Sequence, residues 1–247
     1  MTGTTIDTPL RDEEPTITAE PSVAVTPAKR HRVSTRIWHW VNLFAVVMLF
    51  MSGLNISNAH RYLYWGDWGF SPEQAWLAVP RFPGWATIPG HYSLAEARDW
   101  HLLGAWIFGV ALLFMWLAML VNRHFSRDIA TSRKEWRWPN VRNDIVQHLR
   151  LNFDSGVGKY NFLQKVTYGL VLGVILPLLV FTGMGISPGL EPSFSWMIDA
   201  MGGRQSVRSI HFITSWALFA FFVLHVALVL LSGPIRQIRS MITGVLR

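Results

Sequence analysis

The chain has 247 residues, of which 51% are hydrophobic and 15% are charged. A soluble domain carries about 25% charged residues, so this composition favours a membrane protein. Cysteine is absent, which excludes disulfides, thiolate-bound zinc or iron–sulfur sites and covalently attached c-type haem. The formal net charge is +7, but the sequence contains no nucleic-acid recognition motif. Basic residues in a membrane protein usually report topology and contact with membrane lipids, so no nucleic-acid partner is expected.

Residues 1–30 are rich in Thr, Pro, Asp and Glu and show no apolar periodicity. Such a segment lacks the means to bury a core, so a disordered tail is expected. No signal-peptide pattern precedes the first apolar stretch, which should therefore serve as an uncleaved membrane anchor. We expect residues 31–247 to form one domain.

Four apolar segments are long enough to cross a hydrocarbon core of about 30 Å, which needs about 20 residues. They cover approximately residues 37–56, 100–121, 162–186 and 210–231. Backbone polar groups in lipid must be satisfied within each segment, so all four are expected to be helices. The predicted fold class is an all-α membrane protein, a four-transmembrane-helix bundle.

The connections between these segments differ in charge. Fifteen Lys and Arg residues lie in 29–36, 122–161 and 232–247 together, against five in 57–99 and 187–209. Basic connections face the cytoplasm, so both termini and the middle loop are predicted to be cytoplasmic. The tail at residues 1–30 would then be cytoplasmic as well.

The outer loop, residues 57–99, is long and rich in aromatic residues, among them Trp65, Trp68 and Trp85. Two interpretations remain open. Aromatic residues at this density form belts at headgroup depth. A loop of this length is also a place where a partner protein docks.

Four histidines lie inside the apolar segments, where histidine is rare and usually functional. His211 and His225 are fourteen residues apart on one helix face, about 21 Å along the axis. With alternating helix directions, His39 lies at the depth of His225, and His101 lies at the depth of His211. The inner pair, His39 and His225, and the outer pair, His101 and His211, could each supply the two axial nitrogens of a haem iron. This indicates electron transfer. The alternatives are ordinary core histidines or the proton relay of a transporter.

Other residues suit a wide planar cofactor with carboxylate substituents. Arg98 and Arg208 each precede an outer-pair histidine by three residues, and Arg36 precedes the first histidine of the inner pair by three. Guanidinium binds carboxylate in bidentate fashion, so we expect these arginines to bind propionates. The simpler alternative is contact with lipid headgroups. Gly53 lies at the depth of the outer pair, where the missing side chain would admit a porphyrin edge or serve ordinary helix packing.

Several motifs resemble those of the bacterial di-haem b-type cytochromes. These are the membrane subunits of nickel–iron hydrogenases, formate dehydrogenases and thiosulfate reductases, together with their stand-alone relatives. The resemblance covers about residues 30–247 and is carried by Arg36-Ile-Trp-His39-Trp, Arg98-Asp-Trp-His101, the pair His211 and His225, and Arg239-Ser-Met-Ile-Thr-Gly. It implies two haem b groups bound by the four histidines, and exchange of electrons with a membrane quinone.

The segments Tyr64-Trp-Gly-Asp-Trp and Lys159-Tyr-Asn-Phe-Leu-Gln-Lys165 look like the subfamily that partners periplasmic molybdopterin oxidoreductases. The resemblance therefore implies electron transfer between the quinone pool and a periplasmic molybdopterin-dependent oxidoreductase. A stand-alone superoxide:quinone oxidoreductase is the alternative within the family. The long outer loop argues against it, because a small diffusible substrate needs no docking platform.

Overall fold

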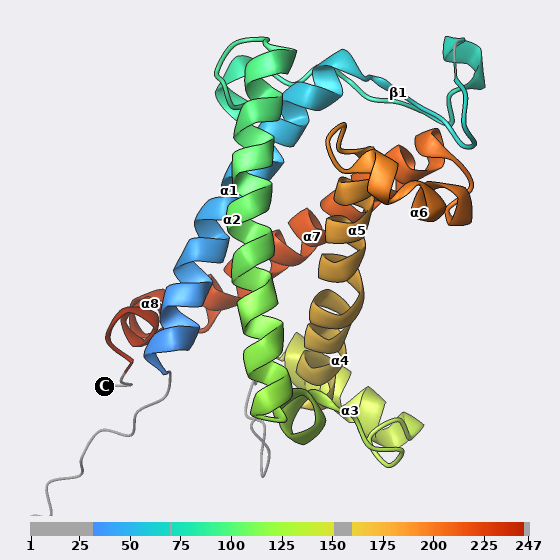
Figure 1. Ribbon diagram of the computed structural model, residues 1–247. Helices are drawn as coiled ribbons and strands as arrows, with labels where there is room; N and C mark the ends of the chain where they lie inside the picture. Colours follow the sequence, from blue (N-terminus) through green and yellow to red (C-terminus); the bar gives the residue numbers. More distant parts are fainter. Residues whose placement is uncertain (1–31, 70, 151–159, 245–247) are drawn as a thin grey trace, which may run out of the picture.

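A computed structural model describes residues 32–69, 71–150 and 160–244 (Figure 1). The expected disordered tail, residues 1–30, lies outside the described residues. Within the described part, four helical stretches are long and apolar enough to cross a membrane: Val33–Ala59, Leu94–Val121, Phe162–Ile186 and Arg204–Leu231. The four predicted spans are thus confirmed. Three of them extend several residues beyond their apolar stretches, because polar residues at the ends continue the helices.

The first, second and fourth spans are the helices α1 (Val33–Ala59), α2 (Leu94–Val121) and α7 (Arg204–Leu231). The third span has three parts: α4 (Phe162–Leu170), the π-helical turn η4 (Val171–Ile175) and α5 (Leu176–Ile186). Pro177 stands at the start of α5. Proline has no N–H to donate to the preceding turn, so the regular hydrogen-bond ladder is interrupted there.

The spans associate as two helix pairs, with α1 along α2 and α5 along α7. Their shared core lies at mid-height and includes Ala45 of α1, Phe108 and Leu112 of α2, and Leu176 of α5. α7 runs obliquely across the bundle, so that one end lies near α5 and α6 and the other near α1 and α8 (Figure 1). This course brings α7 to α2 at one end and to α1 at the other.

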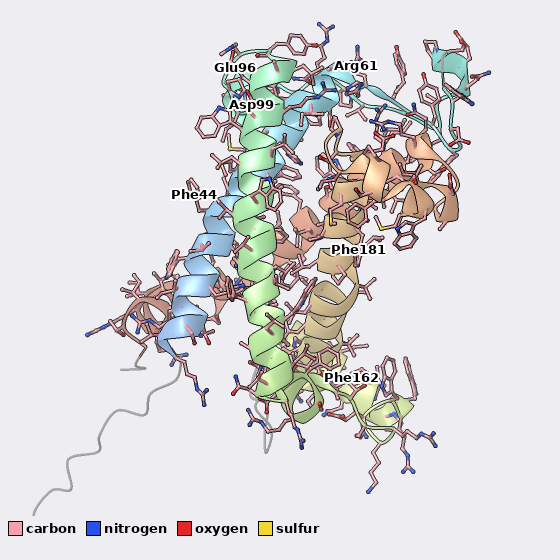
Figure 2. The ribbon with its side chains drawn as sticks, viewed as in Figure 1. Phe44, Arg61, Glu96, Asp99, Phe162 and Phe181 are labelled. Carbon is pink, nitrogen blue, oxygen red and sulfur yellow. The ribbon has the colours of Figure 1, made fainter. Side chains whose placement is uncertain are left out.

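Charged and apolar side chains separate along the bundle. Arg61, Glu96 and Asp99 gather at one end, whereas Phe44 projects outward from α1 (Figure 2). The Phe44 side chain is 62% exposed, as expected for a residue that faces lipid acyl chains.

Shorter elements cover the two ends. At the end reached by residues 57–99, β1 (Tyr62–Leu63) pairs with β2 (Leu77–Ala78) in antiparallel fashion. The other short elements there are η1 (Pro72–Gln74), η2 (Gly84–Ala86), η5 (Glu191–Ser193) and α6 (Ser195–Ala200). The opposite end carries η3 (Phe125–Ile129), α3 (Trp138–Leu149) and α8 (Pro234–Thr243). The helices α3 and α8 at this opposite end were not predicted from the sequence.

Close packing of α1 on α2 depends on Gly104. A Cβ at this position would lie 3.0 Å from Met48 Cε and 3.1 Å from Leu49 Cγ. Gly109, on the same helix, has no such neighbour within 4 Å. Both substitutions gain helix propensity, but only Gly104→Ala adds the cost of overpacking, so it should be less stable than Gly109→Ala by about 1–3 kcal/mol. Thermal unfolding midpoints of the two variants in detergent check this, and equal midpoints would contradict the packing described.

Candidate functional site

α7 brings the four intramembrane histidines together in two pairs. The ring centroids of His101 and His211 lie 6.3 Å apart, and those of His39 and His225 lie 6.4 Å apart. A metal–imidazole nitrogen bond is about 2 Å long, so two imidazoles on opposite sides of one metal ion place their centroids about 6 Å apart. Both pairs therefore have the spacing of a two-histidine metal site.

The outer pair, His101 and His211, is held by hydroxyl groups of the neighbouring helices. Ser52 Oγ of α1 lies 3.0 Å from His101 Nδ1, and Thr182 Oγ1 of α5 lies 2.8 Å from His211 Nδ1. Both hydroxyl residues are fully buried, with 0% exposure. The two helix pairs thus repeat one arrangement, in which a hydroxyl on one helix meets an imidazole on the other.

The hydrogen bonds of these hydroxyls determine the histidine tautomers. Ser52 donates its single hydroxyl hydrogen to the carbonyl of Met48 at 2.7 Å, and Thr182 donates to Leu178 at 2.6 Å. Each oxygen can then only accept from the imidazole, so Nδ1 carries the proton. The lone pair is consequently on Nε2, the nitrogen available to a metal ion.

A glycine follows each of these hydroxyl residues. A Cβ at Gly53 would lie 3.6 Å from His101 Cε1, and a Cβ at Gly183 would lie 3.5 Å from His211 Cε1. Gly53 thus lies at the outer pair, as its depth predicts, and its immediate neighbour is the imidazole ring. No prediction from the sequence included Ser52, Thr182 or Gly183. The available signal was the hydroxyl–glycine dipeptide, which occurs once in the first span and once in the third.

Aromatic rings contact the inner pair. Phe221 stacks on His225 with ring centroids 5.9 Å apart, and Trp40 meets His39 edge-on at 5.4 Å. Phe221 also packs against the buried core between the two pairs. Apolar and aromatic side chains therefore line the path from one pair to the other.

Arg36 contacts the C-terminal end of α8. Its guanidinium donates to the carbonyls of Ile242 and Thr243, and the Trp40 indole donates to Met241 O at 3.3 Å. The last carbonyls of a helix lack intrahelical donors and carry partial negative charge, so a cation is stabilising there. These contacts fasten α8 to α1 one turn before His39. A propionate role for Arg36 stays a prediction that these contacts do not support.

Positive groups converge at the outer end of the site. The pKa of His60 is lowered, first by burial and then by the charges of Arg208 and Arg98. Arg208 and Arg98 lie near the N-terminal ends of α7 and α2, so the tertiary packing of these two helices brings them close together. Within the described part of the chain, neither guanidinium forms an ion pair with a carboxylate, and Arg208 donates to Gln205 Oε1 at 3.0 Å. This end therefore offers positive charge to an anionic group.

The outer loop is fastened to α7 beside the outer pair. The fully buried Ser209 donates to Tyr64 O at 2.6 Å and accepts from Trp76 Nε1 at 2.9 Å. Ser209 precedes His211 by two residues, so the loop is positioned from the helix that carries the site. Trp68 and Trp85 remain 77% and 85% exposed on this loop.

Apolar spans with histidines facing one another between them are the architecture of a b-type membrane cytochrome. Comparison with known families agrees: the chain belongs to the prokaryotic cytochrome b561 family, which matches residues 30–244. The family implies a b-type haem. The protein is accordingly a multi-pass membrane protein.

Three relatives illustrate the family. A putative protein-methionine-sulfoxide reductase subunit YedZ1 of Azospira oryzae is 26% identical over 211 residues, covering 85% of this chain and 93% of the relative. A probable Ni/Fe-hydrogenase B-type cytochrome subunit of Azotobacter vinelandii is 22% identical over 204 residues, covering 78% of this chain and 76% of the relative. The corresponding subunit of Cupriavidus necator is 24% identical over 210 residues, covering 79% and 76%.

The hydroxyl contacts generate a test at the outer pair. Ser52→Ala or Thr182→Val removes the acceptor of an Nδ1–H, which weakens the imidazole as a metal ligand through Nε2. A hydrogen bond contributes about 1 kcal/mol, so the midpoint potential of a haem bound by His101 and His211 should rise by roughly 40 mV. Spectroelectrochemical titration measures this shift.

Thr214→Val is the matched control, because the buried Thr214 hydroxyl donates to Ile210 of its own helix at 2.7 Å. In the Thr214→Val variant, the midpoint potential of a haem bound by His101 and His211 should stay at the wild-type value. Equal potentials in all three variants would show that the Ser52 and Thr182 hydroxyls do not act on the ligands.

Proposed function

We propose that the chain binds two haem b groups and carries electrons across the membrane between the quinone pool and a redox partner on the outer side. The observation that carries this proposal is the pair of facing histidines at each of two depths. The inner haem would be held by His39 and His225, and the outer haem by His101 and His211.

Each haem would supply a one-electron carrier, and a haem held by two histidines would leave no place for a substrate at its iron. The protein's own residues hold and tune it. Ser52 and Thr182 keep the outer imidazoles in the Nδ1–H tautomer, with Nε2 free to bind metal. Arg98 and Arg208 offer positive charge to the propionates of the outer haem.

The distance between the two histidine pairs suits electron transfer across most of the bilayer. His211 and His225 are fourteen residues apart on α7, which corresponds to about 21 Å between ligand positions. Between them the fully buried Leu112 and the nearly buried Phe108 help to form an apolar core. This core keeps water from the region that the electron crosses.

The proposed ligand scheme predicts paired losses. His101→Ala and His211→Ala should each remove the outer haem, and His39→Ala and His225→Ala should each remove the inner one, because one axial ligand alone holds haem weakly. Redox-difference spectra of the purified variants and their haem-to-protein ratios measure the loss. A pattern that groups His39 with His101 would contradict the scheme, and normal haem content in all four variants would exclude these residues as ligands.

We further propose that both chain termini lie in the cytoplasm of a bacterial inner membrane. The basis is the excess of Lys and Arg at the end of the bundle that carries α3 and α8. Alkaline phosphatase fused after Arg247 should be inactive, and phosphatase inserted within residues 57–99 should be active. The reverse result would invert the assignment of inner and outer haems.

The partner is proposed to be a periplasmic molybdopterin-dependent oxidoreductase. The relatives are by their descriptions subunits of a methionine-sulfoxide reductase and of hydrogenases, so membership of a larger redox complex is the common feature. The outer loop supports docking beside the outer haem, because Ser209 fixes it there while Trp68 and Trp85 stay exposed. Exposed tryptophans are typical anchors of protein interfaces.

Trp68→Ala combined with Trp85→Ala should slow electron exchange with the partner at least tenfold, because loss of about 2 kcal/mol at an interface weakens binding about thirtyfold. Stopped-flow haem oxidation or reduction by the co-purifying enzyme measures the rate. Trp106→Ala is the control, since Trp106 is 65% exposed on the membrane-spanning α2.

In the double tryptophan variant, haem content and quinol-driven haem reduction should remain normal. Loss of haem in that variant would show that these tryptophans support the fold. Unchanged kinetics would favour the second candidate, a stand-alone superoxide:quinone oxidoreductase, for which the convergence of Arg98 and Arg208 offers an attractive surface for an anion.

A further inference from the structure

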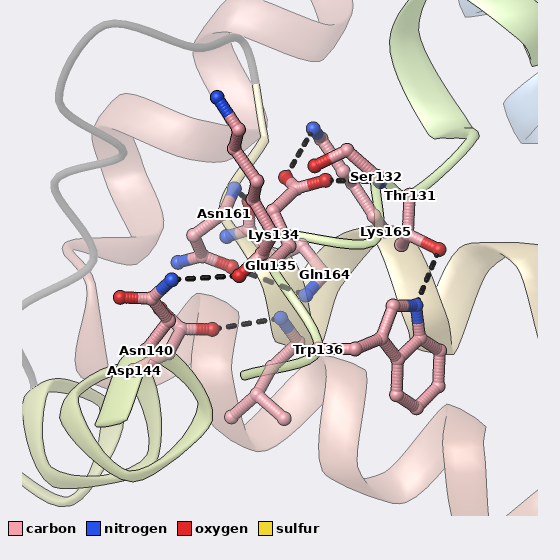
Figure 3. Close-up of polar contacts among 11 residues, drawn as sticks. Thr131, Ser132, Lys134, Glu135, Trp136, Asn140, Asp144, Asn161, Gln164 and Lys165 are labelled. Carbon is pink, nitrogen blue, oxygen red and sulfur yellow. Dashed lines mark hydrogen bonds and ion pairs between the residues drawn. The ribbon is translucent and has the colours of Figure 1, made fainter. Parts of the chain in front are cut away.

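Helix α3 lies across the end of the bundle at which α4 begins (Figure 1). Polar contacts on one side of it fix this position (Figure 3). Asp144 Oδ2 accepts from the Leu163 backbone N–H at 2.7 Å, at the first turn of α4. Glu135, just before α3, forms an ion pair with Lys165 at 2.7 Å. The helix is therefore held where the third span enters the membrane.

Another side of α3 carries an apolar stripe. Trp138, Ile145 and Leu149 are seven and eleven residues apart along the helix, so they share one face. They are 70%, 37% and 79% exposed, and the preceding Trp136 is 58% exposed. Large apolar side chains gathered on one helix face usually mark an interaction surface.

The charges around the stripe are strongly basic. The carboxylates described near the stripe already have partners. Glu135 forms an ion pair with Lys165, Asp144 accepts a hydrogen bond from the first turn of α4, and Asp128 contacts His124 and Arg127. Five cations are exposed and form no ion pair in the part of the chain that the structure describes: Arg133, Lys134, Arg137, Arg142 and Arg150. The surface thus combines an apolar stripe with positive charge that no carboxylate of the described residues neutralises.

We propose that this surface, the α3 patch (Trp136, Trp138, Ile145, Leu149 and the five cations), docks on anionic phospholipid of the leaflet at that end of the bundle. An amphipathic helix with basic and aromatic residues lies in the plane of the membrane surface. Asp144 and Glu135 hold α3 at the base of a membrane span, so headgroups are the anions within reach. The apolar stripe enters the acyl boundary, and the cations bind the headgroup phosphates. This inference is independent of haem binding.

The chain contains no cysteine, so a single introduced cysteine can be labelled without background. Full-length Ile145→Cys carries a spin label on the stripe, and Asn143→Cys carries one on an exposed position of another face. The proteins are placed in nanodiscs of phosphatidylcholine mixed with phosphatidylglycerol. We expect the label at position 145 to collide mainly with oxygen, and the label at 143 mainly with a water-soluble nickel chelate.

Equal access of the nickel chelate to both labels would overturn the proposal, since the stripe would then face water. Exclusion of both reagents from the label at position 145 would also overturn it, because a protein surface would then cover the stripe.

The charge requirement is tested on the same full-length protein. Each Lys or Arg near an anionic surface strengthens partitioning about fivefold. Arg137→Gln combined with Arg142→Gln should therefore lower the phosphatidylglycerol retained by the purified protein, relative to phosphatidylcholine, at least fivefold. Arg81→Gln, an exposed cation at the opposite end, is the control and should leave the ratio unchanged. An unchanged ratio in the double variant would refute the role of the cations.

Discussion

The outer pair of histidines depends on one type of contact, the hydrogen bond from an intramembrane imidazole to a hydroxyl of the neighbouring helix. Ser52 and Thr182 give their hydrogens to their own helices, which leaves their oxygens as acceptors for His101 and His211. A buried imidazole without such a partner would leave a polar group unsatisfied in an apolar region. The hydrogen bond that satisfies Nδ1 also fixes the tautomer and the orientation of the ring. The same contact therefore stabilises the helix packing and positions the imidazole.

A glycine lies beside each of these contacts. Gly53 and Gly183 each follow the hydroxyl residue and meet the edge of the same imidazole. A Cβ at either position would lie in van der Waals contact with the ring, so these glycines leave room at its edge. The arrangement recurs on both helix pairs, α1 with α2 and α5 with α7, so the outer site is built from two similar halves. The inner site differs, because Phe221 and Trp40 supply aromatic contacts there.

Much of this architecture follows from the sequence for simple physical reasons. Lipid imposes a minimum apolar length, so all four spans could be predicted. Alternating helix direction then sets the depth of every residue, which is why His101 could be matched with His211 and His39 with His225. The structure places the members of each pair within 6.4 Å of one another, measured between ring centroids.

Other features could not be predicted, because they depend on helix rotation and on contacts distant in sequence. Depth alone does not reveal that Ser52 faces His101, since this requires the rotation of α1 about its axis. Arg36 contacts Ile242, a residue 206 positions away in the sequence, and the residues around Arg36 give no indication of this contact. Helix α3 is short and its stripe is interrupted by polar residues, so the basic middle loop gave no strong helical signal. Apart from α3, each missed feature concerns orientation or distant contact, and each predicted one concerns length or depth.

The central claim is that each pair of facing histidines binds one haem. The most direct measurement combines haem quantification, as the pyridine haemochromogen per mole of purified chain, with electron paramagnetic resonance of the oxidised protein. The account predicts two haems per chain and two low-spin ferric signals, with no high-spin signal, because both axial positions of each iron are filled by imidazole. One haem per chain, or a high-spin signal from an iron with an open position, would contradict it.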